Sequence, residues 1–218
     1  MSLSESFNFL KRDAKSISPA PLLIMLHGYG SNEKDLFQFA DKLDERLIIL
    51  SLRAPQQLGH NQYQWFALNY SDEVIDADLD QAQKSCELLS NFIDEAILKF
   101  NADPKKIFLL GFSQGAMIAF HTALIYPEKI FSVLALSGRL TSMSFDKRAA
   151  DDKLKHLKIF ISHGINDEII PINRARNTKA LLEKLPIEIN YNEYKMGHGI
   201  NLDCLKDFTN WIKEKIIS

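Results

Sequence analysis

The sequence predicts an α/β fold, with a doubly wound, mostly parallel sheet that carries helices on both faces. Short apolar segments alternate with longer segments of helical periodicity, and this alternation is typical of such sheets. Most of the apolar segments are almost continuously apolar, as expected of parallel strands covered on both faces. No linker rich in glycine, serine or proline interrupts the pattern. Residues 1–218 are therefore expected to form a single domain.

The expected strands are short apolar runs: 21–26, 46–52, 106–112, 131–137, 158–163 and 187–194. The expected helices lie between them: 33–42, 75–100, 114–126, 172–184 and 202–216. The longest helix has apolar residues at close to 3.6-residue spacing on one face. It ends where "NADP" interrupts the pattern. The segments 53–74 and 138–153 are irregular and follow strands at the edge where α/β sheets bind ligands, so they are candidate pocket walls.

Composition excludes several classes of protein. The chain has 46% hydrophobic and 25% charged residues and a formal charge of −2, which is ordinary for a globular protein. Without a long block of like charge, a nucleic-acid partner is not expected. "KRAADDKLKHLK" (147–158) mixes both signs and is expected to be a solvated helix face.

Cysteine usage and the N-terminus predict a soluble, cytoplasmic protein. The two cysteines, Cys86 and Cys204, are too few for a disulfide framework and are expected to be buried or half-buried thiols. "MSLSESFNFLKR" lacks the pattern of a secretion signal. No apolar run approaches the roughly 18 residues of a membrane span, so stable membrane insertion is not expected.

The segment Gly111-Phe112-Ser113-Gln114-Gly115 places a serine between glycines where an expected strand meets an expected helix. A G-x-S-x-G pattern alone is weak, but this junction is the context of a nucleophile elbow. The turn forces the central residue into strained backbone angles and lifts its side chain clear of the sheet. A Cβ two residues before or after would clash with the neighbouring strand or helix, which explains both glycines. Ser113 is therefore the candidate nucleophile.

A serine hydroxyl needs a base that takes its proton and an acid that orients the base. In this architecture the order along the chain is serine, acid, histidine. Of the six histidines, His198 fits best, because it lies between glycines in a segment after the last expected strand. His27 and His60 stand before the serine, and His121 lies within the helix that follows it. His156 lies in a charged segment, and His163 ends a strand before any suitable acid.

Asp167 is the candidate acid. It is the first acidic residue beyond the expected strand 158–163 and precedes His198 in the chain. The adjacent Glu168 remains the alternative. Asp203 follows the histidine and is expected to cap or begin the last helix.

Acyl transfer also needs N–H donors for the developing oxyanion. One is expected from the backbone of Gln114, the residue after the nucleophile, and the other from the backbone of Tyr29, in the loop after the strand 21–26. Gly28 and Gly30 allow that loop a close approach but lack the further residues of a phosphate-binding loop. His27 is expected to pin the loop by hydrogen bonds.

Five motifs, "LHGYG", "GFSQGA", "LALSG", "HGINDEIIP" and "MGHGI", occur in this order and resemble the phospholipase/carboxylesterase family of α/β-hydrolases. The resemblance spans residues 21–212. It implies an α/β-hydrolase fold without a cap domain and an open active site that acts on carboxylic esters or thioesters of short to medium acyl chains. It also implies the roles assigned above to the catalytic residues and to the two backbone donors.

"QWFALN" (64–69) resembles the aromatic segment of the family near the site. Many members carry an acidic residue where this chain has Ala67. Trp65 and Phe66, with Leu140 and Ile169, are candidates for the acyl pocket, and core packing is the alternative for each. We identify no metal-ligand spacing and no cofactor site.

The sequence therefore predicts a serine hydrolase that works through an acyl-enzyme. A peptidase or dienelactone-type hydrolase on the same fold is one alternative, although the latter usually has a cysteine nucleophile; a non-catalytic α/β-hydrolase scaffold is another. The sequence leaves open whether the substrate is a small-molecule ester or thioester or an acylated protein. It also leaves open whether the chain is a monomer or a homodimer.

Overall fold

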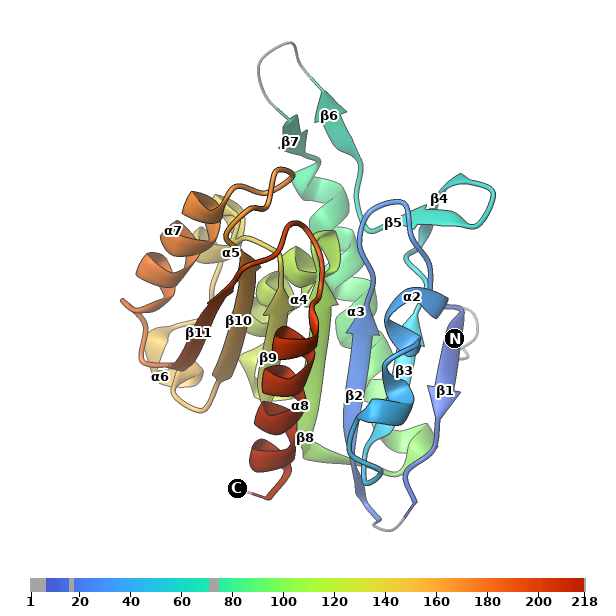
Figure 1. The fold of residues 1–218 in the computed structure, drawn as a ribbon. Coiled ribbons are helices and arrows are strands. Elements are labelled where there is room, and N and C mark those ends of the chain that lie inside the picture. The colour runs from blue at the N-terminus through green and yellow to red at the C-terminus, as the bar shows by residue number, and fades with distance from the viewer. Residues whose placement is uncertain (1–6, 16–17, 71–74, 218) are drawn as a thin grey trace.

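A seven-stranded sheet forms the centre of the computed structural model, which describes residues 7–15, 18–70 and 75–217. The order across the sheet is β1-β3-β2-β8-β9-β10-β11 (Figure 1). Strand β1 pairs antiparallel with β3, and the other pairs are parallel. The bounds are Phe9–Arg12 (β1), Ala20–Leu26 (β2), Ile48–Leu52 (β3), Ala102–Phe112 (β8), Ser132–Leu136 (β9), Lys158–Gly164 (β10) and Glu188–Tyr194 (β11).

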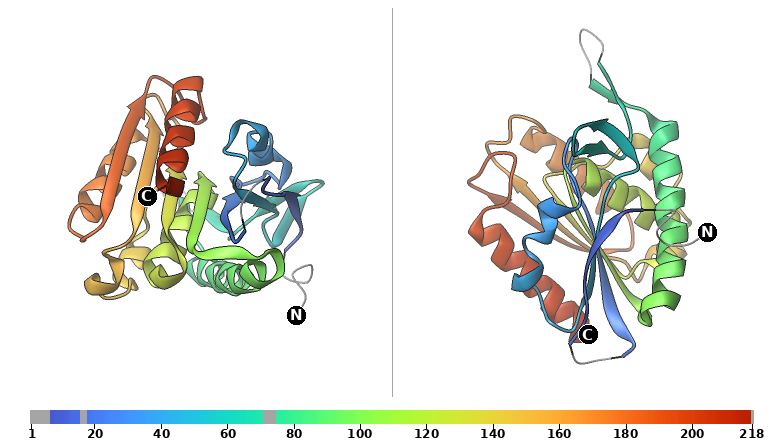
Figure 2. Two further views of the ribbon diagram at one scale, coloured as in Figure 1. Left: turned by 90° about the horizontal axis from the view of Figure 1, so that it is seen from below. Right: turned by 90° about the vertical axis from the view of Figure 1, so that its right-hand side faces the viewer.

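Helices cover both faces of this sheet, as Figure 2 shows from below. One face carries α3 (Leu79–Phe100), α4 (Gln114–Ile125) and α7 (Ile172–Leu182); the other carries α2 (Lys34–Phe37), the 3₁₀ turn η1 (Ala40–Lys42) and α8 (Leu202–Ile217). Strand β2 is buried on both sides, because its successive side chains point into the two cores in turn. The predicted doubly wound α/β fold is confirmed.

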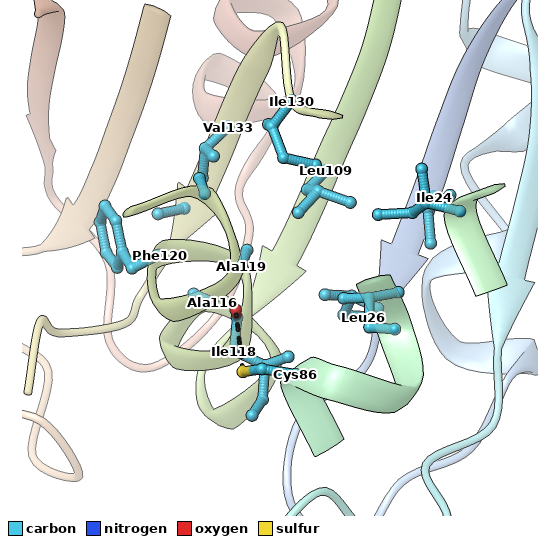
Figure 3. Close-up of a cluster of buried hydrophobic side chains, with 14 of the residues drawn as sticks. Ile24, Leu26, Cys86, Leu109, Ala116, Ile118, Ala119, Phe120, Ile130 and Val133 are labelled. Atoms are coloured by element: carbon cyan, nitrogen blue, oxygen red, sulfur yellow. Dashed lines mark hydrogen bonds between the residues drawn. The ribbon is translucent and has the colours of Figure 1, made fainter. Parts of the chain in front are cut away.

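The larger core lies between the sheet and the pair α3 and α4. Figure 3 shows part of it, where Ile24 and Leu109 from the strands face Ala116 and Ala119 of α4. Cys86 of α3 is buried there beside Ile118, and Cys204 is buried under the other face, both as free thiols. Burial raises the pKa of Cys86 to about 12 and that of Cys204 to about 11. The expectation of buried thiols is confirmed.

The predicted strands are all present, but two predicted helices differ. The segment 33–42 forms the short pieces α2 and η1 rather than one helix. The long helix begins at Leu79, not at Ile75, because Ile75–Ala77 forms strand β7 and pairs with β6 (Leu68–Tyr70). Asp78 then caps the helix, accepting a hydrogen bond from Gln81 N.

Some elements lie outside the predicted set. They are the edge strand β1, the hairpins β4–β5 (Gln56–Gly59 and Gln62–Gln64) and β6–β7, and the short helices α5 (Ser142–Asp146) and α6 (Asp151–Leu154). Strands β4, β5 and β6 lie in the segment 53–74 and helices α5 and α6 lie in or at the end of the segment 138–153, which were expected to be irregular, whereas β7 replaces the start of the predicted helix. Within the charged stretch 147–158, only α6 is helical. Among the described residues, no helix has the length and apolar character that crossing a bilayer requires.

The junction between β8 and α4 leaves no room for side chains at its glycines. A Cβ on Gly111 would lie 2.4 Å from the carbonyl oxygen of Gly115, and one on Gly115 would lie 2.0 Å from that of Leu26. Ser113 between them has φ 52° and ψ −114°, an unusual conformation for a residue with a Cβ. The glycines thus allow α4 to pack directly against the ends of β2 and β8, as predicted.

Replacing Gly115 with alanine should destabilise the protein by about 3 kcal/mol or more, because the new Cβ meets backbone that cannot move aside. The free energy of unfolding in urea measures this. Gly199→Ala is the control, since a Cβ there has no atom within 4 Å, and it should change stability by no more than about 0.5 kcal/mol. Equal stability of the two variants would contradict this account of the elbow.

His121, on α4, is buried in a polar contact between helices. Its ring nitrogens lie 2.9 Å from Ser144 Oγ and 2.9 Å from Gln83 Oε1. Because the amide oxygen of Gln83 can only accept, Nε2 donates to it and Nδ1 accepts from the Ser144 hydroxyl. Burial lowers the pKa of His121 to about 4, with Lys147 contributing less. The folded protein therefore holds this imidazole neutral, away from Ser113.

Acid should weaken the fold through His121. The unfolded chain takes up a proton near pH 6.5, whereas the folded chain does so only near pH 4. The stabilising contribution is complete above pH 6.5 and is lost as the pH falls through this window, by about 3 kcal/mol at most. Urea unfolding at about pH 7 and about pH 4 measures the loss. His121→Gln, which cannot titrate, should lose less stability over the same interval; an equal loss would contradict the assignment.

Candidate active site

Ser113 begins the site at the end of β8. Its backbone N–H donates to Leu136 O of the neighbouring strand (2.9 Å), which fixes the turn to β9. The residue is 9% exposed. The N-terminus of α4 follows directly, where the first N–H groups have no acceptor within the helix and the helix dipole favours negative charge.

His198 lies against the serine. Its Nε2 atom is 2.9 Å from Ser113 Oγ, and its Nδ1 atom is 2.7 Å from Asp167 Oδ2. An ionised carboxylate only accepts hydrogen bonds, so Nδ1 donates to Asp167 and Nε2 accepts from the serine hydroxyl. The imidazole also packs on the ring of Phe112, with ring centroids 5.0 Å apart.

Asp167 is held at the end of β10 with its side chain fully buried. Oδ1 accepts hydrogen bonds from the backbone N–H groups of Ile169 (2.9 Å) and Ile170 (2.8 Å), which leaves Oδ2 for His198. Glu168, the alternative acid, is exposed. Asp203 lies in the first turn of α8, as expected.

Backbone contacts bring the loops of the acid and the base together. Ile165 N donates to Tyr194 O (2.9 Å), and Asn166 N donates to Met196 O (3.1 Å). A Cβ on Gly164 would lie 2.3 Å from the carbonyl oxygen of Gly197, so this close contact requires glycine. The loop after β10 and the loop after β11 therefore form one connected rim beside the elbow.

The loop after β2 approaches the elbow from the other side. A Cβ on Gly28 would lie 3.5 Å from the Cβ of Ser113. Gly30 N donates to Tyr63 O, and Tyr63 N donates to Ser31 O, each at 2.9 Å. These bonds fasten the loop that carries Tyr29 to strand β5.

His27 fixes the start of this loop. Its Nε2 atom accepts from Ala54 N (3.0 Å), so the proton lies on Nδ1, which donates to Gly28 O (2.7 Å). Burial lowers the pKa of His27, which favours the neutral ring that this arrangement needs. His27 thus holds the loop after β2 by two hydrogen bonds, as expected.

The side chain of Gln114 has a role that the sequence analysis missed. Its Oε1 atom accepts from Trp65 N (2.8 Å), and its Nε2 atom donates to Phe66 O (2.8 Å). This buried amide joins the aromatic segment to the residue directly after Ser113. A polar residue in the first turn of a mostly apolar helix was the available signal.

The four residues predicted to line the acyl pocket have different surroundings. Trp65 is buried in core contacts: its ring lies 5.9 Å from that of Phe7, and its Nε1–H donates to His27 O (2.9 Å). Phe66 borders a small, mostly apolar hollow with Met117, which is one turn along α4 from Ser113. Leu140 is buried, whereas Ile169 is 70% exposed beside the acid.

The remaining histidines lie apart from the serine or behind the acid. His60 is exposed, and His156 donates to Pro127 O (2.8 Å). His163 is buried on the inner side of Asp167. In the described part of the chain, no group of three or more histidine, cysteine, aspartate or glutamate residues is arranged to hold a metal ion.

Comparisons with known proteins agree with this architecture. Acyl-protein thioesterase 1 of Kluyveromyces lactis is 26% identical over 222 residues, covering 94% of this chain and 96% of that protein. Acyl-protein thioesterase 1 of Saccharomyces cerevisiae is 28% identical, with 95% and 98% covered. The crystal structure of the Bacillus cereus carboxylesterase has a TM-score of 0.80 at 22% identity, covering 96% of this chain and 94% of that one, and shares the fold.

Residues 13–216 match the family described as Phospholipase/Carboxylesterase. This match covers nearly the whole chain and includes every motif on which the resemblance was based. The chain therefore belongs to the phospholipase/carboxylesterase family of α/β-hydrolases, a family of ester-hydrolysing enzymes.

Proposed function

We propose that the protein hydrolyses carboxylic esters or thioesters through an acyl-enzyme, with Ser113 as nucleophile, His198 as base and Asp167 as acid. The observation that carries the proposal is the continuous chain of hydrogen bonds from Asp167 Oδ2 through the imidazole to Ser113 Oγ. The two acyl-protein thioesterase relatives support the reaction class.

The proposed reaction follows from the donors and acceptors of this chain. Ser113 Oγ attacks the acyl carbonyl while its proton passes to His198 Nε2, and the Asp167 carboxylate stabilises the imidazolium. His198 then protonates the leaving alcohol or thiol. A water molecule, deprotonated by the same imidazole, attacks the acyl-enzyme and releases the acid.

The oxyanion of each tetrahedral intermediate is proposed to bind the backbone N–H groups of Gln114 and Tyr29. Gln114 stands at the first position of α4, where N–H groups lack helical acceptors. The loop that carries Tyr29 is fixed close to Ser113 by the contacts of Gly28 and Gly30. Rigid donors of this kind stabilise developing charge because they need no reorganisation during the reaction.

The substrate is proposed to carry a short to medium acyl chain, either as a small ester or thioester or on an acylated protein. Exposed Ile169, two residues from the proposed acid, and Tyr29, in the loop beside Ser113, offer apolar surface near the site. The hollow bordered by Phe66 and Met117, of about 10 Å³, is too small to hold an acyl chain. We also propose that the chain forms a single domain and is located in the cytoplasm. Its two buried free thiols, Cys86 and Cys204, fit a reducing compartment.

Variants of the proposed triad test this function. Ser113→Ala and His198→Ala should abolish hydrolysis of p-nitrophenyl butyrate, and Ser113→Ala should abolish labelling by a fluorophosphonate probe. Asp167→Asn should lower kcat by about 10⁴-fold, the loss that the same change causes in another triad enzyme. Circular dichroism verifies that each variant is folded.

Glu168→Gln is the matched control, because its exposed carboxylate neighbours Asp167 in the chain. It should keep full activity, and the opposite pattern would make Glu168 the acid. A wild-type protein that neither hydrolyses esters or thioesters nor takes up the probe would instead be a non-catalytic scaffold. Hydrolysis of peptide substrates in preference to esters would favour the peptidase alternative.

Gln114→Ala should destabilise the protein while sparing the chemistry. The change leaves the buried Trp65 N–H and Phe66 carbonyl without partners, which costs about 2–4 kcal/mol in the free energy of unfolding. The backbone N–H remains, so kcat per probe-reactive site should stay within about threefold of wild type. Gln38→Ala, which removes an exposed glutamine that donates to Asp35 O, should leave stability unchanged. A large loss of kcat in a stable Gln114 variant would overturn the view that only the backbone acts.

A further inference from the structure

His163 is a buried histidine that the proposed reaction does not use. It is the penultimate residue of β10, and its side chain is completely excluded from solvent. Its Nε2 atom lies 2.7 Å from Ile170 O and 3.3 Å from Asp167 Oδ2. A buried, hydrogen-bonding side chain that touches the proposed acid calls for a physical explanation.

The two contacts of His163 meet the same turn that orients Asp167. Ile170 donates its N–H to Oδ1 of that carboxylate and accepts the Nε2–H of His163 at its carbonyl. A carbonyl accepts only from a protonated nitrogen, so the proton of the ring lies on Nε2, facing both Ile170 O and Oδ2. His163 therefore holds the turn at Ile170, and its Nε2–H lies near Asp167 Oδ2, the same oxygen that accepts the hydrogen bond of His198.

The surroundings of His163 exclude direct participation in the reaction. Its Nε2 atom and His198 Nδ1 both lie near the same oxygen, Asp167 Oδ2, and its side chain is fully buried, so substrate does not reach it. Its Nδ1 atom is buried without a hydrogen-bond partner in the described residues. The two polar contacts that the ring makes are thus both with the acid and its turn.

We propose that His163 is a positioning residue, which fixes the Asp167 carboxylate so that Oδ2 faces His198 Nδ1. The inference rests on the proposed function, because it gives a role only if Asp167 is the acid. Displacement of a catalytic group by about 1 Å can cost on the order of 100-fold in rate. Loss of the Nε2 donor should therefore reduce turnover without affecting the binding of substrate.

His163→Leu removes the donor, and His163→Gln restores an N–H at a similar reach. With p-nitrophenyl butyrate, we expect the Leu variant to lower kcat by about 10- to 100-fold with KM unchanged, and the Gln variant to recover kcat to within about threefold of wild type. The control is His156→Leu, which removes a histidine that also donates to a backbone carbonyl, that of Pro127, but from the turn before β10, at the opposite end of that strand from His163. It should keep full activity.

A double-mutant cycle separates positioning from general stability. If His163 acts through Asp167, His163→Leu should change kcat by less than about twofold in the Asp167→Ala background. An equal loss in both backgrounds, or an unchanged kcat for the single Leu variant, would overturn the inference. If Asp167→Ala itself leaves kcat unchanged, the proposed function fails instead.

Folding is measured for each variant by urea unfolding, and kcat is expressed per fluorophosphonate-reactive site. His163→Met, which also lacks the donor, replaces the Leu variant if the latter does not fold. Failure of both apolar variants to yield folded protein, with a fully active Gln variant at lower stability, would assign His163 to stability alone and overturn the proposal.

Discussion

The direct approach of α4 to the backbone of β2 and β8 is the constraint on which the site depends. It exists because Gly111 and Gly115 have no Cβ, and any other side chain would overlap a carbonyl oxygen. The close packing forces Ser113 into its positive φ, and it places the N-terminus of α4 directly beside the serine. The surrounding core, packed from both faces of the sheet, stabilises this strained turn.

A second level of organisation holds the proposed acid and base against the serine. The Asp167 carboxylate is surrounded by donors: two backbone N–H groups, the His198 ring and the nearby Nε2 of His163. A buried carboxylate needs such partners, since an unpaired charge away from water is strongly unfavourable. The same contacts define its orientation, so stabilisation of the charge and alignment of the site have one cause.

Much of this architecture could be predicted from the sequence. The strands of the sheet are continuous apolar runs, and the glycines around Ser113 mark a turn that few other residues allow, so both the fold and the elbow were evident. Asp167 and His198 could be chosen because chain order excludes most competitors. In the structure His198 lies within hydrogen-bonding distance of both Ser113 and Asp167, and the catalytic roles of the three residues stay a prediction.

What escaped prediction depends on contacts between distant segments. β1 is an edge strand whose pairing with β3 leaves little periodic pattern. The hairpin β4–β5 is short and polar, and the strands of β6–β7 have only three residues each. The side-chain contacts of Gln114 and His163 reach residues that only the folded chain brings near. His163 was set aside because it stands before the acid in the chain, and chain order carries no information about a residue that supports the carboxylate of the acid.

The loops of the acid and the base are joined through main-chain atoms, Ile165 N to Tyr194 O and Asn166 N to Met196 O. Any amino acid except proline can supply such an N–H, so, apart from Gly164, which the close contact requires, the side chains of these loops are free to diverge while the geometry persists. Evolution can thereby alter which acyl donors this rim accepts without rebuilding the machinery that cleaves them.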